Sequence, residues 1–321
     1  MASMRYQQSL AAGLHDAMAD DPQVLVMGED VGQSLRGVTR GLQEEFGAER
    51  VIDMPLSEQA FTSFATGLAL SGFRPVVEYQ IPSLLYLVFE QIVNQAQKFR
   101  LMTGGQASVP VTYLVPGSGA RQGLAGQHSD HPYSFFVHAG VKTVVPATPE
   151  DAYGLFRSAI NDDDPVAVFA PAAALGVRTD AANVGQLVPL GVGRIHRPGT
   201  DVTVLAVGHL VHDALAVAAD LADEISVEVV DPRTVYPMDW NLLAESLERT
   251  GRLVVFDDAN VSCGFAAEVV ATAAESMHLV APPRRVTRAD AVVPFAVALE
   301  RVVLPSREQL TAAIHGVMKE R

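Results

Sequence analysis

The sequence is poor in cysteine, in long apolar runs and in basic residues. A single cysteine, Cys263, excludes an internal disulfide and favours a reducing compartment, so we expect a cytoplasmic protein. No apolar run approaches the roughly 20 residues needed to span a bilayer, and residues 1–6 lack the apolar core of a signal peptide. Lys and Arg number 23 against 37 Asp and Glu, a formal net charge of −14. This charge argues against a surface that binds nucleic acid or an anionic membrane.

Apolar residues make up 49% of the 321, which is enough for a core in each of two domains. Apolar β-type runs, such as 24–30 and 109–116, alternate with helical patterns, such as 6–18 and 84–102. Strands that are apolar on both faces must be covered on both sides. The pattern therefore predicts an α/β protein with a mostly parallel sheet between layers of helices.

The alternation breaks over residues 171–198, which are rich in alanine and show no clear period, and a second α/β set begins at residue 201. We therefore expect a first domain over residues 1–180, a linker over 181–200 and a second domain over 201–321.

Residues 51–61 predict a strand, a turn at Pro55 and a helix with Ser57 as its N-cap. Glu58 then lies in the first turn of that helix, at the carboxyl end of a strand, where open α/β sheets bind ligands. The alternative is a surface acid that only complements the helix dipole.

Two histidines, His128 and His131, flank Asp130 in a loop. Two histidines three residues apart do not define a metal site without a helix face or cysteines, so we interpret His131 as a solvated loop residue. The glycines of residues 117–123 lack the Gly-Lys-Ser/Thr ending of a phosphate-binding loop.

Seven short motifs in order resemble the β subunit of the E1 component of 2-oxo acid dehydrogenase complexes, of the pyruvate, branched-chain and acetoin types. Residues 283–298 (PRRVTRADAVVPFAVA) resemble the C-terminal segment of the same family. The motifs are 28–31 (GEDV), 55–59 (PLSEQ), 72–78 (GFRPVVE), 89–94 (FEQIVN), 104–106 (GGQ), 127–129 (QHS) and 144–149 (VVPATP).

The resemblance implies a thiamine diphosphate-binding domain of the pyrimidine type, followed by an α/β domain of the transketolase C-terminal type. It also implies that thiamine diphosphate binds between this chain and a separate α-type chain, which holds the diphosphate and Mg²⁺, in an α2β2 heterotetramer. The sequence has no Gly-Asp-Gly diphosphate motif with a following Asn, in agreement with a β chain. The other implied partner is a lipoyl-bearing acyltransferase, or a carrier protein.

In this family a glutamate hydrogen-bonded to N1′ of the aminopyrimidine favours the tautomer that removes the C2 proton of the cofactor. The resemblance gives that role to Glu58. It implies that His128 faces the reactive carbon and assists acyl transfer, as imidazole suits proton transfer near neutral pH; the alternative is a histidine that only orders its loop. It places Glu29 in a proton network, or else as a turn acid. The implied cofactor-binding residues are Glu29, Leu56, Glu58, Gln80, Leu84 and Tyr86.

Residues 158–164 resemble a structural potassium site of some relatives, in which backbone carbonyls bind the ion. The corresponding positions are Val111, Ala159, Asp162 and Asp164. A solvated acidic turn is the alternative.

The chain also departs from the family pattern. Leu84 stands where an aromatic residue usually stacks on the pyrimidine, Asp130 replaces the glutamine of His-Ser-Gln, and 170–172 (APA) replaces Glu-Pro-Lys. These changes keep a second hypothesis open: half of a split transketolase-like enzyme that moves a two-carbon unit to a carrier-protein or biosynthetic acceptor. A third hypothesis, a non-catalytic scaffold, is disfavoured because Glu58 and His128 are retained.

Overall fold

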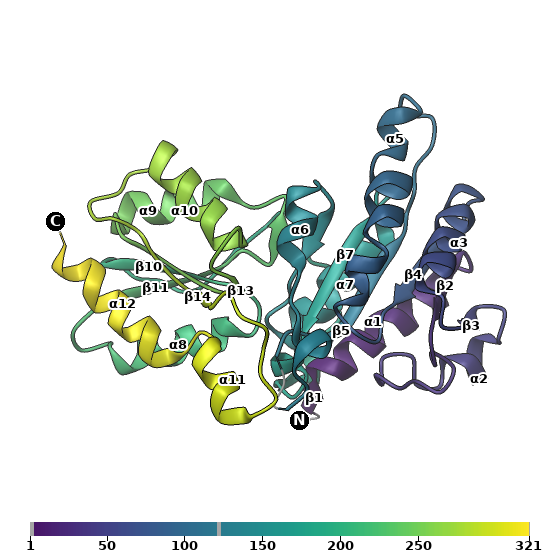
Figure 1. The fold of residues 1–321 in the computed structure, drawn as a ribbon, viewed down its shortest axis with the longest axis horizontal. Helices are drawn as coiled ribbons and strands as arrows, with labels where there is room; N and C mark the ends of the chain where they lie inside the picture. Colours follow the sequence, from purple (N-terminus) through teal and green to yellow (C-terminus); the bar gives the residue numbers. More distant parts are fainter. Residues whose placement is uncertain (1–2, 121–122, 321) are drawn as a thin grey trace.

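The computed structural model describes residues 3–120 and 123–320. Figure 1 shows two α/β halves side by side, with the N-terminal half on the right and the C-terminal half on the left. Arg121 and Gln122, in the glycine-rich loop, lie outside the described residues. None of the helices in the described ranges is long and apolar enough to cross a membrane.

The N-terminal half is built on a seven-stranded sheet in the order β12-β6-β7-β5-β4-β2-β3. All neighbours pair in parallel except β12, which comes from the C-terminal half of the chain and pairs antiparallel with β6. The strands are β2 (Val24–Gly28), β3 (Val51–Asp53), β4 (Arg74–Glu78), β5 (Thr112–Ser118), β6 (Lys142–Val144), β7 (Val166–Pro171) and β12 (Thr234–Tyr236).

Helices cover both faces of this sheet, as the apolar strands predict, and two separate cores result. One core packs Leu10 and Phe156 against one face, and the other packs Phe61 and Ile92 against the opposite face. The helices are α1 (Tyr6–Asp20), α2 (Leu42–Phe46), α3 (Glu58–Leu70), α4 (Leu84–Leu87), α5 (Phe99–Met102), α6 (Tyr133–His138) and α7 (Pro149–Asn161).

The single long α-helix expected over residues 84–102 is wrong in detail. The segment contains α4, a seven-residue π-helix at Gln91–Gln97 and α5, and its α5 end projects from the body in Figure 1. Gln95 Nε2 donates to Glu90 Oε1 at 2.8 Å, a pair five residues apart that suits the wider π turn. Hydrophobic periodicity does not separate the two helix types.

The C-terminal half is built on a five-stranded sheet in the order β14-β13-β10-β11-β9, parallel except at β9. The strands are β9 (Arg194–Arg197), β10 (Val202–Ala206), β11 (Val227–Asp231), β13 (Leu253–Asn260) and β14 (Arg284–Arg288). The helices are α8 (Leu210–Asp220), α9 (Trp240–Thr250), α10 (Phe265–Ser276), α11 (Val297–Val303) and α12 (Arg307–Lys319).

Residues 171–198 carry regular structure that the sequence pattern did not predict. β8 (Arg178–Asp180) pairs antiparallel with β1 (Ser3–Arg5), and β9 forms an edge of the second sheet. Both strands are short and rich in charged residues. Such edge strands show no apolar alternation, because neither face is fully buried.

Thr148 and Ser306 cap α7 and α12 through their side chains, whereas Ser57, the predicted N-cap of α3, does not. Thr148 Oγ1 accepts from Asp151 N at 3.1 Å, and Ser306 Oγ accepts from Gln309 N at 3.3 Å. Ser57 occupies the N-cap position of α3, but its side chain makes no capping bond. Its ψ of 70° differs from the 162° of Thr148 and the 163° of Ser306, so its hydroxyl is turned away from the free amides.

Gly28 ends β2 where the backbone of β4 approaches most closely. A Cβ at Gly28, whose φ is +157°, would lie 2.4 Å from the carbonyl oxygen of Glu78. We predict that Gly28→Ala lowers the free energy of unfolding by roughly 1–3 kcal/mol, because neither backbone can give way. Urea denaturation measures this difference.

Gly67→Ala is the matched control. Gly67 lies in α3, where an added Cβ would meet no neighbouring atom within 4 Å, and alanine in a helix is favoured over glycine by about 1 kcal/mol. Equal stability of Gly28→Ala and wild type would contradict the close approach of β2 and β4.

Candidate functional site

The predicted cofactor residues lie at one edge of the first sheet, beyond the carboxyl ends of parallel neighbours. Glu29 follows β2, Glu58 follows β3 at the start of α3, and Gln80 follows β4. His128 lies on the loop after β5, in a 3₁₀ turn at Gly126–Ser129. This edge is where open α/β sheets bind ligands, as the position of Glu58 in the sequence suggested.

Glu29 and Glu58 form a pair of acids at this edge. Burial is the main cause that raises the pKa of Glu29 to about 7, and the adjacent Glu58 carboxyl, within hydrogen-bonding reach, raises it further. Glu29 Oε1 is buried and has no hydrogen-bond partner in the described structure, whereas Glu58 is partly exposed. Glu29 is therefore able to hold a proton near pH 7, next to the carboxyl group of Glu58.

Gln80 connects Glu29 to a buried polar group beneath it. Its Nε2 donates to the carbonyl oxygen of Glu29 at 2.8 Å and to Glu78 Oε1 at 3.1 Å. Arg36 Nε in turn donates to Gln80 Oε1 at 3.1 Å, and Arg36 also donates to the Gln80 carbonyl. The amide of Gln80 is thus fixed on both sides, which holds the backbone of Glu29 in place.

Apolar side chains lie on the segment before Glu58 and on α4, which contacts α3. Leu56 is 84% exposed and Tyr86 is 49% exposed, while Leu84 is partly buried. Gln59 Nε2, next to Glu58, donates to the carbonyl oxygen of Leu87 at 3.2 Å and ties α3 to α4. The arrangement offers uncovered apolar surface next to a carboxyl group, which suits an aromatic ring that carries a hydrogen-bonding nitrogen.

His128 is partly buried, and its backbone N donates to the carbonyl oxygen of Ala125 at 3.1 Å. Two residues later, Asp130 faces Tyr86. Burial, followed by the charge of Asp130, raises the pKa of the Tyr86 hydroxyl to about 12. The loop of His128 and the helix that carries Tyr86 therefore meet at one place.

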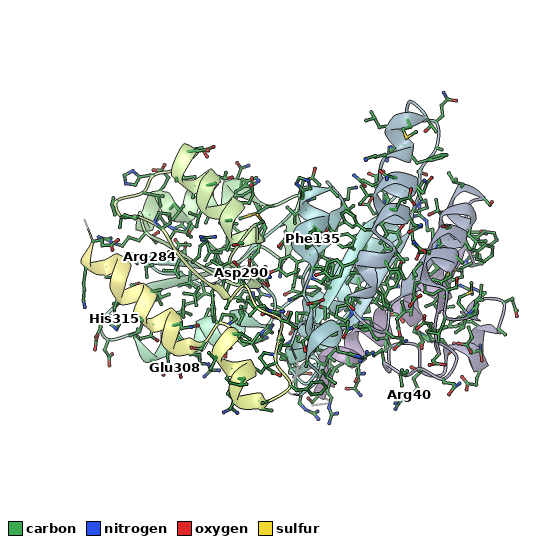
Figure 2. The ribbon with its side chains drawn as sticks, viewed as in Figure 1. Arg40, Phe135, Arg284, Asp290, Glu308 and His315 are labelled. Atoms are coloured by element: carbon green, nitrogen blue, oxygen red, sulfur yellow. The ribbon has the colours of Figure 1, made fainter. Side chains whose placement is uncertain are left out.

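A cavity of about 710 Å³ opens beside this meeting point, between the two halves of the chain. Tyr86, Asp130 and Phe135 line it from the N-terminal half, and Ser262 and Asp290 from the C-terminal half. Phe135 and Asp290 are labelled in Figure 2, near the junction of the halves.

The interpretation of His131 as a solvated residue is wrong. Its side chain is 2% exposed and packs edge-on against Tyr133 with 4.6 Å between ring centres, and burial lowers its pKa. His131 Nδ1 lies 3.6 Å from Asp258 Oδ2, and Arg288 donates to Asp258 Oδ1 at 3.1 and 2.9 Å. The sequence gives no local signal for this cluster, because His131 lies in the N-terminal half whereas Asp258 and Arg288 come from β13 and β14 of the C-terminal half.

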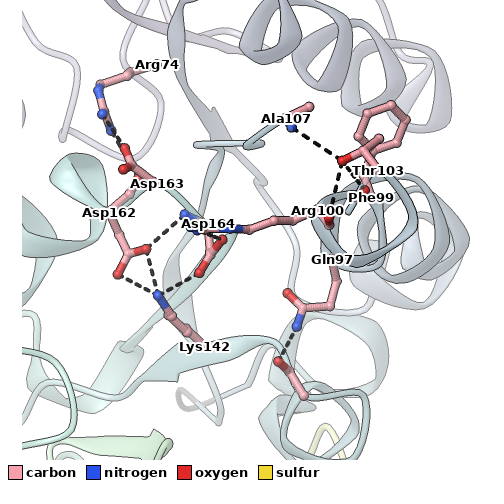
Figure 3. A network of polar contacts seen from close by, with 11 residues as sticks. Arg74, Gln97, Phe99, Arg100, Thr103, Ala107, Lys142, Asp162, Asp163 and Asp164 are labelled. Carbon is pink, nitrogen blue, oxygen red and sulfur yellow. Dashed lines mark hydrogen bonds and ion pairs between the residues drawn. The ribbon is translucent and has the colours of Figure 1, made fainter. Parts of the chain in front are cut away.

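The predicted potassium positions lie at the opposite, amino-terminal edge of the sheet, where lysine and arginine side chains contact the acidic residues. Lys142 Nζ contacts Asp162 Oδ1 and Oδ2 at 2.8 and 2.9 Å and Asp164 Oδ2 at 3.0 Å (Figure 3). Arg100 donates to Asp164 Oδ1 at 2.7 Å, and Arg74 donates to the carbonyl oxygen of Asp162 at 3.0 Å.

The carbonyls of the other two potassium positions also have protein donors. Val111 O accepts from Val166 N at 3.0 Å, and Ala159 O accepts from Asp162 N at 3.3 Å. Each of these two carbonyl oxygens accepts one hydrogen bond and keeps a second lone pair. Potassium binding through the backbone here stays a prediction.

A further polar cluster lies between the halves. His196 Nε2 is 3.2 Å from Asp231 Oδ2, and Arg233 Nη2 is 2.7 Å from Asp151 Oδ1. The ligand atoms of His196, Asp231 and Asp151 lie within 4.8 Å of one another. Arg233 comes from the C-terminal half and Asp151 from α7 of the N-terminal half, so their ion pair links the two halves.

Family models match both halves of the chain. Residues 2–177 match the transketolase pyrimidine binding domain, and residues 191–310 match the transketolase C-terminal domain.

Curated relatives match along almost the whole length. The 3-methyl-2-oxobutanoate dehydrogenase subunit beta of Mycobacterium tuberculosis is 41% identical over 327 residues, covering 99% of this chain and 93% of its own. The pyruvate dehydrogenase E1 component subunit beta of Bacillus subtilis is 38% identical, covering 99% of this chain and 100% of its own. The chain belongs to the transketolase-like family of E1 β subunits. A third member, the acetoin:2,6-dichlorophenolindophenol oxidoreductase subunit beta of Bacillus subtilis, is 38% identical over 95% of this chain and 94% of its own.

A solved structure described as a split gene transketolase, inactive beta4 tetramer, has the same fold. Its TM-score is 0.83 at 21% identity, and the match covers 99% of this E1 β-family chain and 100% of that one. The two-domain transketolase-like α/β fold predicted from the sequence is confirmed.

Glu78 supplies a test of the buried polar group beneath the site. Burial raises its pKa to about 7 although Gln80 donates to it, and its Oε2 is buried without a partner. Because the pKa of Glu78 is higher in the folded chain than in the unfolded chain, ionisation of Glu78 favours unfolding. The stability that is present below the unfolded-state pKa is therefore lost as the pH rises through about 7. Glu78→Gln cannot ionise, so we predict that it matches wild type at pH 5 and is more stable at pH 8, by up to about 3 kcal/mol.

Urea denaturation at pH 5 and pH 8 measures this difference. Glu44→Gln, at an exposed site in α2, is the matched control and leaves the pH dependence of wild type unchanged. If the free energy of unfolding changes equally between pH 5 and pH 8 in wild type and in Glu78→Gln, then Glu78 is not the buried acid described here.

Proposed function

We propose that this chain is the β subunit of a thiamine diphosphate-dependent E1 component, which decarboxylates a 2-oxo acid such as pyruvate and passes the acyl group to a lipoyl-bearing partner. The observation that carries the proposal is the acid pair Glu29 and Glu58 at the carboxyl edge of the sheet, in a chain of the E1 β family. A separate α-type chain is required for activity.

The residues at this edge fit the aminopyrimidine half of thiamine diphosphate. Glu58 is partly exposed and free to meet a ring nitrogen, and Glu29 beside it has a buried oxygen with no partner. Leu56, Leu84 and Tyr86 would hold the ring faces, and Gln80 would fix the backbone of Glu29. These are the six residues that the sequence assigned to the cofactor.

The bound cofactor supplies a carbon nucleophile for attack on the 2-oxo group. Glu58 would hold a proton at its carboxyl oxygen, toward the ring nitrogen. Glu29 would keep that proton available, because two adjacent carboxyl groups do not both ionise readily near pH 7. The leucines and the tyrosine would exclude water, which strengthens the hydrogen bond of Glu58.

His128 would move a proton at its imidazole during transfer of the acyl group to its acceptor. Support comes from its place on the loop after β5, beside the cavity of about 710 Å³ between the halves. Asp130, two residues after His128, lines that cavity, so an acceptor that enters it would come close to the loop of His128.

The assembly that fits these features is an α2β2 heterotetramer in which the α-type chain holds the diphosphate and Mg²⁺. Large apolar side chains stand exposed on this chain, among them Leu101 at 84% and Met102 at 75% on the projecting α5. Exposed apolar surface of this kind marks protein contacts. We assign no role to potassium, because Lys142, Arg74 and Arg100 already neutralise the acidic turn.

A second candidate function is half of a split transketolase-like enzyme that moves a two-carbon unit to a carrier-protein or biosynthetic acceptor. It is favoured by the apolar segment Ala170 to Leu175, where relatives carry Glu-Pro-Lys. Ala170, Ala172 and Ala174 are all buried and offer no polar group to an acceptor.

Glu58→Gln tests the proposed role of the acid pair. In the complex reconstituted with an α-type chain, we predict that turnover falls by at least about 100-fold, since the amide cannot exchange the proton that the carboxyl holds. Steady-state assays with a 2-oxo acid and an artificial electron acceptor measure the loss. Glu44→Gln keeps full turnover, and unchanged turnover of Glu58→Gln would favour a non-catalytic scaffold.

Product analysis separates the two enzymatic functions. We predict that the reconstituted complex releases carbon dioxide from a 2-oxo acid in step with acceptor acylation and does not use a ketose phosphate. Radiolabelled pyruvate and radiolabelled ketose phosphate are offered in parallel, and the released carbon dioxide and the labelled acceptor are measured for each. Two-carbon transfer from the ketose without carbon dioxide would establish the split transketolase function instead.

A further inference from the structure

The loop that carries His128 has a backbone that needs support from outside. Ala125 has a φ of 51° and Gly126 a φ of 43°, so two successive residues lie in the left-handed region. For alanine this conformation costs about 1 kcal/mol or more. Two local backbone bonds are present: Gly119 N donates to Asp130 O across the base of the loop, and His128 N donates to Ala125 O within the turn.

Three hydrogen bonds from the C-terminal half support the same loop. Gly123 N donates to Glu300 Oε2 at 3.1 Å, and Gly126 N donates to the carbonyl oxygen of Val293 at 3.2 Å. Arg288 Nη1 donates to the carbonyl oxygen of Ser129 at 2.9 Å. The bonds reach the residue Gly123 before the 3₁₀ turn, the first residue of the turn and its last residue, so residues 288–300 hold the loop on both sides of His128.

Arg288 is itself fixed in a buried ion pair. Its Nε and Nη2 donate to Asp258 Oδ1 at 3.1 and 2.9 Å, and both residues are 3% exposed. Burial opposes the ionised form of Asp258, but Arg288 and then His131 outweigh it and hold the pKa of Asp258 well below its usual range. The guanidinium is therefore locked in place with Nη1 aimed at Ser129.

We infer that Arg288 and Glu300, from the C-terminal half of the chain, are positioning residues that hold the loop of residues 123–130 and so place His128 for proton transfer. This inference rests on the proposed function of His128. It gives the C-terminal half a part in the reaction: small shifts of residues 288–300 are transmitted to His128 through three hydrogen bonds. A 1 Å displacement of a reacting group is enough to cost about 100-fold in rate.

The test uses Glu300→Ala, which removes the acceptor of Gly123 N, and Glu300→Gln, which keeps an oxygen at that place. Arg301→Ala is the matched control, because Arg301 is the exposed neighbour on α11. Amide hydrogen exchange of the full chain, followed by mass spectrometry, reports on the loop without cofactor. We expect exchange over residues 123–130 to speed up by at least about tenfold in Glu300→Ala and to stay near wild type in Glu300→Gln and Arg301→Ala. Unchanged exchange of β5 shows that Glu300→Ala is folded.

The second readout is turnover of the reconstituted complex. We expect kcat of Glu300→Ala to fall by at least about tenfold while the affinity for thiamine diphosphate stays within about twofold, with rescue by Glu300→Gln. Arg288→Lys keeps the positive charge but loses the guanidinium group that bonds Asp258 and Ser129 at the same time, so we expect the same fall in kcat. Unchanged exchange in Glu300→Ala overturns the inference, and so does faster exchange with normal kcat. His128→Ala with normal turnover would instead overturn the proposed role of His128, while the exchange result would still decide whether Glu300 holds the loop.

Discussion

The proximity of two carboxyl groups, Glu29 and Glu58, is the constraint on which the account depends. The negative charge of Glu58 disfavours ionisation of the adjacent Glu29, and the burial of Glu29 disfavours it further. The fold nevertheless brings them together, because β2 and β3 are parallel neighbours whose following residues meet at one edge. Gly28 permits the close approach of β2 to β4, and Gln80 with Arg36 fixes the backbone of Glu29. An arrangement that costs stability and is held by several contacts is typical of a functional site.

The C-terminal half of the chain contacts the predicted site directly. β12 extends the first sheet, and residues 288–300 hold the loop of His128 through three hydrogen bonds. The cavity next to Tyr86 is lined by residues of both halves. Among the described residues, the groups that gather at this edge are carboxyl, imidazole, amide, phenol and apolar side chains, together with the guanidinium of Arg36. The family relationship and the exposed apolar side chains on α5 both fit a site that a second type of chain completes.

Much of this could be predicted from the sequence where local pattern decides the structure. The alternation of apolar strands and helices predicts the parallel sheet and its two helical layers, and the strand before Glu58 places that residue at the carboxyl edge. Capping by Thr148 and Ser306 follows from residues three positions apart. The motifs of the E1 β family also identify the fold, and several of them lie where a strand ends or a helix begins, as 28–31 does after β2 and 55–59 does at the start of α3.

Other features depend on contacts between distant residues and have no local signal. His131 is buried by Tyr133 and Asp258, and Arg288 reaches Ser129 across 159 positions. The π turn at Gln91–Gln97 has the same apolar spacing as an α-helix over so short a length. At the potassium positions, the acidic residues were visible in the sequence, but the cations that meet them come from α5, β4 and β6.

The most direct test of the central claim is a crystal structure of the complex assembled with its α-type chain and thiamine diphosphate. The account predicts that a carboxyl oxygen of Glu58 lies at hydrogen-bonding distance, about 2.6–3.2 Å, from N1′ of the pyrimidine ring. A structure with the Glu58 carboxyl in solvent, and the pyrimidine bound elsewhere, would contradict it.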